Sequence, residues 1–347
     1  MLLVALAAGA FAFMKYNEVK SLGAKAVEPA SDEPIPFTVK KGSSPSKVVR
    51  DLKAKGLIED AQLFRLYLQR IAKKANTIQA GEYVLNKSMS GDELIAALGK
   101  GRAKEISFTI PEGLRKNEIA EIIARSGLVT KRELLLAMNN KALANAFGVP
   151  KKGADGQDKI PGGIEGYLYP DTYQFPKGVS AEAILKKMRK RLDEVIDDKM
   201  RARMKEMGWS LHKVLTLASI VEKETGQAYE RPLIAALFLN RMRMKPPMKL
   251  QTDPTVIYGI KNYDGNIRRR DLTTPHPYNT YTIKGLPPGP IASPGKNAIN
   301  AVLFPGKTKA LYFVSKNDGT HIFSETLAQH NAAVQKWQVE FFRNKRR

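Results

Sequence analysis

A short pattern that occurs twice constrains the fold of this chain more than any other sequence feature. The first copy, 37–58, is a strand-like run that ends in Gly, followed by a helical run that also ends in Gly. The second copy, 108–129, has its two glycines at the same spacing, and it begins 71 residues after the first. Two copies are too few for a solenoid. The sequence therefore predicts two related strand–turn–helix units within an α+β protein.

The rest of the chain predicts a larger second half. Its 347 residues are enough for two or three domains of about 100–200 residues each. A Pro-rich spacer at 28–36 precedes the first copy, and a Gly-rich, charged stretch at 151–163 follows the second. Beyond it we expect a long helical pattern at 181–207, loops and short strands around a site at 245–305, a strand at 310–314 and a last helix through Phe342.

The N-terminal residues predict contact with a membrane. Residues 1–14 carry no charge, and Lys15, Lys20 and Lys25 follow them. A membrane-spanning helix needs about 20 apolar residues, so a run of this length is typical of a signal peptide or of an incomplete span. We interpret it as a membrane anchor whose start is incomplete, and a cleavable signal is the alternative.

The charge of the chain predicts attraction to polyanions. Its 57 Lys and Arg exceed its 34 Asp and Glu, which gives a net charge of +23, and such a field attracts nucleic acid, anionic lipid and acidic glycan alike. The tight basic clusters are 268–270 and 343–347, and aromatic residues do not alternate with them as a base-stacking platform requires. Anionic lipid headgroups explain the charge at least as well. We therefore expect no nucleic-acid partner.

Several kinds of chemistry lack the residues that they need. The chain has no Cys, and its four His show no metal-ligand spacing. It also lacks the Gly-x-Ser-x-Gly elbow of serine hydrolases, a phosphate-binding loop and a dinucleotide fingerprint. We therefore expect neither a metal site nor a cofactor.

One acidic residue stands at a position where the helical pattern predicts an apolar one. Ser210 is a suitable N-cap, and Leu211, Leu215 and Ala218 recur at helical spacing, with Glu222 next on the same stripe. Loss of hydration disfavours a charged carboxylate and raises its pKa, so that Glu222 could act as a general acid. The alternative is that Glu222 merely ends the buried stripe and pairs with a nearby Arg or Lys.

Several longer motifs resemble one family. They are 165–173 (EGYLYPDTY), 218–225 (ASIVEKET), 250–258 (LQTDPTVIY), 278–281 (YNTY) and 285–291 (GLPPGPI). Together they resemble the endolytic murein transglycosylases, the YceG-like (MltG) family, in the same order from about residue 37 to the C-terminal helix. Tyr169 stands where Phe is expected, and His276 is inserted in a Pro-rich turn.

The resemblance implies a fold and a location. It implies a single-pass inner-membrane protein that faces the periplasm, with a small LysM-like module ahead of a mixed α/β catalytic domain that carries a lytic-transglycosylase or lysozyme-like glutamate site. The resulting division is an anchor at 1–17, a linker at 18–36, a LysM-like module at 37–103, a catalytic region at 104–342 and a basic tail at 343–347. Within the catalytic region, the second strand–turn–helix unit is 104–150 and the catalytic domain is 160–342.

The resemblance also implies an activity. It predicts that the β-1,4 bond between N-acetylmuramic acid and N-acetylglucosamine is cut in nascent peptidoglycan strands, which forms 1,6-anhydro-muramic acid ends and terminates elongation. Penicillin-binding peptidoglycan synthases are the implied protein partners. The alternative function is that of a non-catalytic peptidoglycan-binding scaffold.

The resemblance assigns roles to single residues. Glu222 is the implied catalytic acid/base, and the implied glycan cleft is lined by Gln251, Thr252, Asp253, Asn279, Tyr281 and Glu165. Glu224 and Asp253 are the nearest candidates for a second carboxylate, and activation of water by either would make the enzyme a hydrolase.

Overall fold

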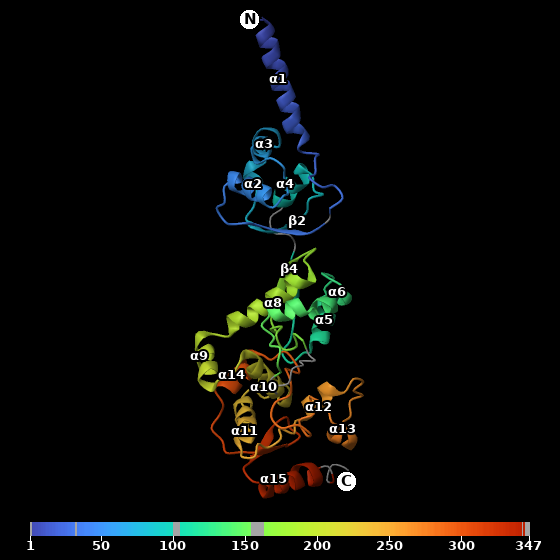
Figure 1. Ribbon diagram of the computed structural model, residues 1–347, viewed down its shortest axis with the longest axis vertical. Helices are drawn as coiled ribbons and strands as arrows, with labels where there is room; N and C mark the ends of the chain where they lie inside the picture. The colour runs from blue at the N-terminus through green and yellow to red at the C-terminus, as the bar shows by residue number, and fades with distance from the viewer. Residues whose placement is uncertain (1, 32, 100–104, 154–162, 342, 344–347) are drawn as a thin grey trace. The chain divides into compact units, whose positions relative to one another are not determined.

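The computed structural model describes residues 2–31, 33–99, 105–153, 163–341 and 343 (Figure 1). The chain divides into two compact units. Unit 1 holds Met1–Phe108, Ser126–Val129 and Tyr173–Ser180, and unit 2 holds Thr109–Arg125, Thr130–Thr172 and Ala181–Arg347. The predicted boundary at 103/104, the predicted domain start at 160 and most of the predicted basic tail lie outside the described residues. The predicted domain limits therefore stay predictions.

Unit 1 is built on a two-stranded antiparallel sheet in which β1 (Ile35–Val39) pairs with β2 (Gly81–Leu85), Phe37 opposite Tyr83. Its other elements are α1 (Leu2–Ser21), α2 (Pro45–Ala54), α3 (Ala61–Leu66), the π-helical turn η1 (Tyr67–Ile71), the 3₁₀ turn η2 (Ala75–Thr77) and α4 (Gly91–Gly99). Alternate residues of both strands are buried against α2 and α4, which gives this unit a hydrophobic core of its own.

Residues 2–14 of the uncharged N-terminal run lie in α1. In the part of the chain that the structure describes, no helix is both long enough and apolar enough to cross a bilayer.

The repeated pattern corresponds to repeated local structure. Helix α5 (Lys116–Arg125) begins and ends 71 residues after α2. The strand ahead of it, β3 (Glu105–Thr109), pairs with β4 (Thr172–Pro176). The four glycines of the two copies, Gly42, Gly56, Gly113 and Gly127, have φ between +69° and +80°, a region that side chains strongly disfavour. The glycines therefore fix the turn before each helix and the end of each helix.

Unit 2 is mainly helical, and three helices at its centre, α10 (Leu211–Glu224), α11 (Arg231–Arg243) and α14 (Lys296–Leu303), pack against one another (Figure 1). Besides α5, its other helices are α6 (Lys131–Met138), α7 (Lys141–Ala146), α8 (Ala181–Val195), α9 (Asp198–Met207), α12 (Asp253–Gly259), α13 (Arg269–Thr273), α15 (Leu327–Val334) and the π-helical η3 (Gln335–Glu340). An antiparallel hairpin joins β5 (Tyr312–Ser315) to β6 (His321–Ser324). The prediction of a mixed α+β protein is confirmed.

Two expectations about local structure are wrong. The pattern at 181–207 forms two helices, because Asp197 leaves the helical conformation and its side chain accepts a hydrogen bond from Met200 N at 2.8 Å, as an N-cap does. The region 245–305 forms loops and short helices, α12 to α14, and its described residues contain no strand. Pro254 occupies the first turn of α12. The N–H that proline lacks would have no partner within the helix at this position, so proline is tolerated there. The proline that suggests a loop in the sequence therefore marks the start of a helix.

Candidate active site

Helix α10 places Glu222 at the edge of the core of unit 2. Ser210 caps the helix through Lys213 N at 3.3 Å, and Leu215 and Ala218 on the predicted stripe are fully buried. Glu222 lies in the last turn, and 5% of its side chain is exposed. The carboxyl group therefore occupies the desolvated position that the stripe predicts.

Two donors hold the carboxyl group of Glu222. Arg231 Nη2, from the first residue of α11, donates to Oε1 at 2.6 Å, and the backbone N–H of Gly295, the N-cap of α14, donates to Oε2 at 3.0 Å. Burial raises the pKa of Glu222, the Gly295 N–H and Arg231 oppose that rise, and the charge of Glu112 adds to it. The pairing with an Arg that the alternative interpretation expects is present, yet the net effect favours the protonated acid.

Glu112 is the acidic side chain that shares Arg231 with Glu222. Arg231 Nη1 lies 3.5 Å from Glu112 Oε2, and the exposed fractions of these two side chains are 9% and 42%. Gly113 lies close by, because a Cβ atom built on it would be 3.5 Å from Glu222 Cγ. Lys223 Nζ also donates to the carbonyl oxygen of Gly113 at 3.2 Å. The loop before α5 and the starts of α11 and α14 thus meet around Glu222.

The predicted cleft residues of 251–253 and 279–281 form a second cluster. Thr252 N donates to Thr280 Oγ1 at 3.0 Å, and the hydroxyl of Tyr281 donates to Asp253 Oδ1 at 2.7 Å. Gln251 is exposed and has a φ of +47°, which is uncommon for a residue with a side chain and typical of functional sites. The structure brings these motifs together, whereas none of the hydrogen bonds and ion pairs of the described residues connects them with Glu222.

Glu224 belongs to the second cluster rather than to the first. It lies two residues after Glu222 and therefore on another side of α10. Burial raises its pKa to about 7, and the charge of Asp253 adds to the rise. The side chain of Thr252 opposes that rise through a hydrogen bond to the Glu224 carboxyl group. The predicted candidates for a second carboxylate are Glu224 and Asp253. The acid that shares the cation Arg231 with Glu222 is instead Glu112.

Asn279 has a structural role in this cluster. Its side-chain amide donates to the carbonyl oxygens of Asp271 (3.0 Å), Leu272 (3.2 Å) and Thr274 (2.8 Å), and its own carbonyl accepts from Tyr281 N at 3.0 Å. The residue is almost completely buried. All of its polar side-chain atoms are therefore used to hold the loop around α13.

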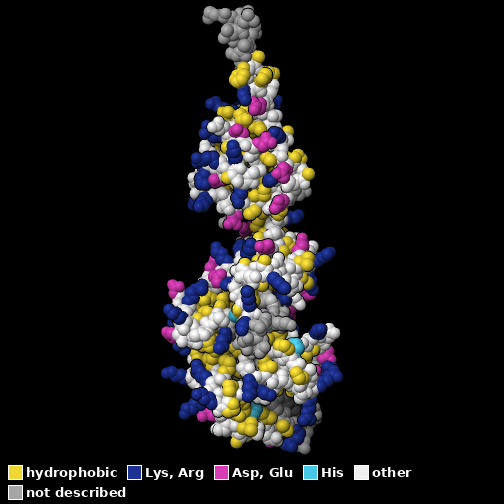
Figure 2. Space-filling model, in the orientation of Figure 1, with side chains coloured by type: hydrophobic (Ala, Val, Ile, Leu, Met, Phe, Trp, Pro, Cys, Tyr) yellow, Lys and Arg dark blue, Asp and Glu magenta, His cyan; other side chains and the backbone are white. Residues whose placement is uncertain are grey.

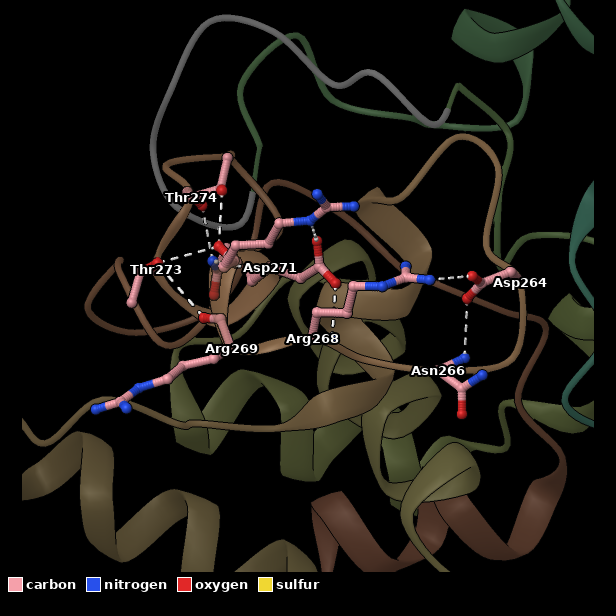
Figure 3. A network of polar contacts seen from close by, with 9 residues as sticks. Asp264, Asn266, Arg268, Arg269, Asp271, Thr273 and Thr274 are labelled. Carbon is pink, nitrogen blue, oxygen red and sulfur yellow. Dashed lines mark hydrogen bonds and ion pairs between the residues drawn. The ribbon is translucent and has the colours of Figure 1, made fainter.

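The same loop carries the predicted basic cluster 268–270. Figure 3 shows Arg268 directed at Asp264, with which it forms an ion pair, while Arg269 extends away from the labelled network. The backbone N–H of Arg268 also donates to Asp271 Oδ2 at 2.8 Å. Part of this positive charge is thus neutralised within the loop.

Glu165 is buried at the start of α5. Its residue is 2% exposed, its Oε1 accepts from Lys116 N at 2.8 Å and its Oε2 accepts from the hydroxyl of Tyr258 at 3.3 Å. Burial raises its pKa to about 7. Tyr258 in turn stacks under the guanidinium of Arg115, 5.1 Å from the ring centre. Glu165 therefore connects α5 to α12, and both of its hydrogen-bond partners differ from those of Glu222.

The sequence signals for Glu112, Arg231 and Gly295 are weak. Glu112 lies in the second copy of the repeated pattern, which indicates local structure alone, and the other two lie outside the motifs that carry the family resemblance. Among the described residues there is no group of three or more His, Asp or Glu side chains that could hold a metal ion.

Comparison with known sequences decides the family. A sequence profile of the YceG-like family matches residues 37–336, which is most of the chain. The chain belongs to the YceG-like family. The resemblance that the motifs showed is thereby confirmed.

Relatives of this YceG-like protein include named and structurally characterised proteins. It is 35% identical over 317 residues to a Bacillus subtilis (strain 168) protein named endolytic murein transglycosylase, and the alignment covers 90% of the chain and 87% of the relative. A Streptococcus pneumoniae (strain D39) protein of the same name is 26% identical over 334 residues, and the chain spans 59% of its length. A crystal structure of a YceG-like protein from Listeria monocytogenes matches with a TM-score of 0.60 at 34% identity, over 87% of this chain and 99% of that one.

Proposed function

We propose that this protein is an endolytic lytic transglycosylase that cuts the β-1,4 bond between N-acetylmuramic acid and N-acetylglucosamine in nascent peptidoglycan strands. The observation that carries the proposal is the carboxyl group of Glu222, which is 5% exposed and whose pKa is raised by burial. A raised pKa lets a buried carboxylic acid keep its proton to higher pH than an exposed one, which favours its use as a general acid. Family membership and the names of the relatives support the same activity.

The reaction uses Glu222 twice. Protonated Glu222 donates its proton to the oxygen that joins the two sugars, the bond from that oxygen to C1 of N-acetylmuramic acid breaks, and the bonding electron pair stays on the oxygen. The C6 hydroxyl of the same muramic acid then bonds to C1 and gives its proton to the Glu222 carboxylate. This attack is intramolecular and therefore favoured by geometry. The product is a 1,6-anhydro end, and no water is consumed.

The remaining parts of the chain fit this activity as proposed supporting modules. The two-stranded sheet of unit 1 with α2 and α4 is proposed to be a LysM-like, glycan-binding module. Gln251, Thr252, Asp253 and Tyr281 are proposed to line the glycan cleft, and Asn279 and Glu165 to hold its walls through the contacts described above. Placement in the inner membrane, with the catalytic part in the periplasm, is proposed from the uncharged run 1–14 and from the family to which the chain belongs. We also propose that this cleavage terminates strand elongation and that a penicillin-binding peptidoglycan synthase is the protein partner.

The test is the substitution Glu222→Gln, which keeps the shape of the side chain and removes its proton. The purified chain is incubated with uncrosslinked peptidoglycan strands, and the products are measured by mass spectrometry. We expect wild type to form anhydro-muramyl ends and the variant to lose at least about 100-fold in rate, the usual contribution of a general acid. Glu206→Gln is the matched control, because Glu206 is 65% exposed in a surface ion pair with Arg203.

One observation favours the scaffold alternative. The ion pair with Arg231 and the 5% exposure of Glu222 also suit a residue that only stabilises the fold. The product masses separate the two functions, because a scaffold binds strands and leaves their masses unchanged. Reducing muramic acid ends in place of anhydro ends would instead identify a hydrolase.

A further inference from the structure

Two carboxyl groups at this site share one guanidinium group. Arg231 Nη2 lies 2.6 Å from Glu222 Oε1, and Arg231 Nη1 lies 3.5 Å from Glu112 Oε2. The backbone of Gly295 touches both acids: its N–H donates to Glu222 at 3.0 Å, and a Cβ atom on it would fall 1.8 Å from Glu112 Oε1. Glu112 is therefore packed into the site.

The three groups in direct contact, Arg231, Glu112 and Glu222, are electrically neutral only when one acid is protonated, because Lys223 is exposed and its charge is screened. Arg231 carries one positive charge, and its side chain is 9% exposed, so it needs a counter-ion. If both acids were ionised, an uncompensated negative charge would be left in a poorly hydrated place, and two neighbouring carboxylates resist ionising together. The proton binds the acid whose ionised form is less stabilised by hydration. That acid is Glu222, whose side chain is 5% exposed, against 42% for Glu112.

We propose that Glu112 is the permanent counter-ion of Arg231 and thereby a positioning residue for the reaction, because it leaves Glu222 free to hold the proton that it donates. This inference rests on the proposed function. Glu112 takes part in no bond making or breaking.

The charged and polar groups that face Glu222 come from four segments. Arg231 approaches from α11, the Gly295 N–H from the start of α14, Lys223 from α10 itself and Glu112 from the loop before α5. Lys223 is exposed, so water and salt screen its charge. Tyr169 lies near Glu112 and is buried, and its raised pKa keeps it neutral. Within this set, Glu112 supplies the negative charge that opposes Arg231.

Substitutions of Glu112 and of Arg231 should shift the pH dependence of the reaction rate in opposite directions. A general acid loses activity as the pH rises above its pKa. Glu112→Gln removes a like charge and so lowers the pKa of Glu222, which moves the alkaline limb of the rate profile to lower pH. Arg231→Gln removes the cation that favours ionised Glu222 and moves the same limb to higher pH. A merely structural role would lower the rate by the same factor at every pH.

The experiment measures the initial rate of anhydro-end formation on saturating uncrosslinked strands against pH, for wild type, both variants and the control Glu206→Gln. We expect the limb to move in opposite directions in the two variants and to stay in place in the control. On the alkaline side, the rate should change about tenfold for each pH unit by which the limb moves. Glu112→Asp keeps the charge and should move the limb back toward that of wild type. A limb that stays in place or moves to higher pH in Glu112→Gln would overturn the inference.

A second measurement does not depend on activity. Carbon-13 NMR of the labelled glutamate carboxyl groups, assigned by comparison with Glu222→Gln, follows the titration of Glu222 without substrate. Glu112→Gln should lower its midpoint. If the midpoint moves as expected while no variant and no wild-type sample forms anhydro ends, the proposed function fails and the charge sharing stands; an unmoved midpoint in an active enzyme rejects the charge sharing alone.

Discussion

Substitution of Gly295 reports on the contact between Glu112 and Arg231 without replacing either side chain. A Cβ atom there would lie 1.8 Å from Glu112 Oε1 and 1.9 Å from its carboxyl carbon, so one of them must move. The end of a flexible Glu side chain moves easily, and the backbone of Gly295, with φ −81° and ψ 173°, accepts alanine. We expect Gly295→Ala to fold, to displace Glu112 and to shift the alkaline limb of the rate profile to lower pH, the direction also expected for Glu112→Gln.

The outcome is read from the rate profile together with a melting curve. Gly226→Ala is the matched control, because a Cβ atom on the exposed Gly226 meets nothing within 4 Å. A Gly295→Ala profile that coincides with that of wild type would mean that Glu112 can leave its place without consequence for Glu222.

At the residue scale, the sequence predicts the burial of Glu222 but not the groups that surround it. Glu222 is predictable because helical spacing alone places it on the buried stripe after Ala218. Glu112 is not, since it precedes Glu222 by 110 residues and reaches it only through tertiary packing. Asn279 shows the opposite case: its position in a motif suggests a cleft residue, whereas its amide is fully used by loop carbonyls.

At the element scale, the turn around Gly166 should be among the least replaceable connections of unit 2. Gly166 has a φ of +79°, and a Cβ atom on it would lie 2.4 Å from Pro290 Cβ and 3.2 Å from Ala292 O. Neither a proline ring nor a backbone carbonyl can relieve the overlap by changing rotamer. We expect Gly166→Ala to lower the free energy of unfolding by about 3 kcal/mol, from the left-handed backbone and the overpacking together. Urea denaturation measures it, with Gly226→Ala near zero, and a loss below about 1 kcal/mol would show that this loop rearranges freely.

Sequence periodicity predicts some elements well for a physical reason. Helices α2 and α5 repeat at 71 residues, because each is bounded by glycines in the left-handed conformation, a signal that is local in the chain. The break between α8 and α9 escapes prediction although Asp197 is a suitable N-cap, since apolar periodicity continues through it. The short helices α12 and α14 escape it because Pro254 and Gly295, at their starts, are read as loop residues.

At the scale of the whole molecule, net charge says little about the site. Figure 2 shows Lys and Arg side chains spread over the visible face with Asp and Glu among them, so on this face the positive charge is not gathered into one patch. The proposed chemistry depends instead on buried carboxyl groups, which composition cannot distinguish from exposed ones. Three of them, Glu165, Glu222 and Glu224, have pKa values raised by burial.

These buried acids should make global stability depend on pH. Glu165 and Glu224 each have a folded-state pKa of about 7 against an ordinary value of 4.5. The folded state therefore holds protons that the unfolded chain releases, and the stabilisation is fully present below about pH 4.5 and lost as the pH rises through about 7. Each acid contributes on the order of 3 kcal/mol across that window. Carboxyl groups with lowered pKa, such as Glu133, act below this window.

The contribution of Glu165 and Glu224 is isolated by comparing wild type with a variant that lacks both carboxyl groups. His276 and His330 have lowered pKa values, so they add stability as the pH rises and oppose the two acids in wild type. Their contributions cancel when the unfolding free energy of wild type is compared with that of the double variant Glu165→Gln, Glu224→Gln at each pH, from urea denaturation. Glutamine cannot ionise, so the unfolding free energy of the variant should rise relative to that of wild type between pH 4.5 and 7. Above about pH 7 the difference between the two should stay constant. A difference that stays flat across the window would mean that water reaches both carboxyl groups and that the fold does not hold them neutral.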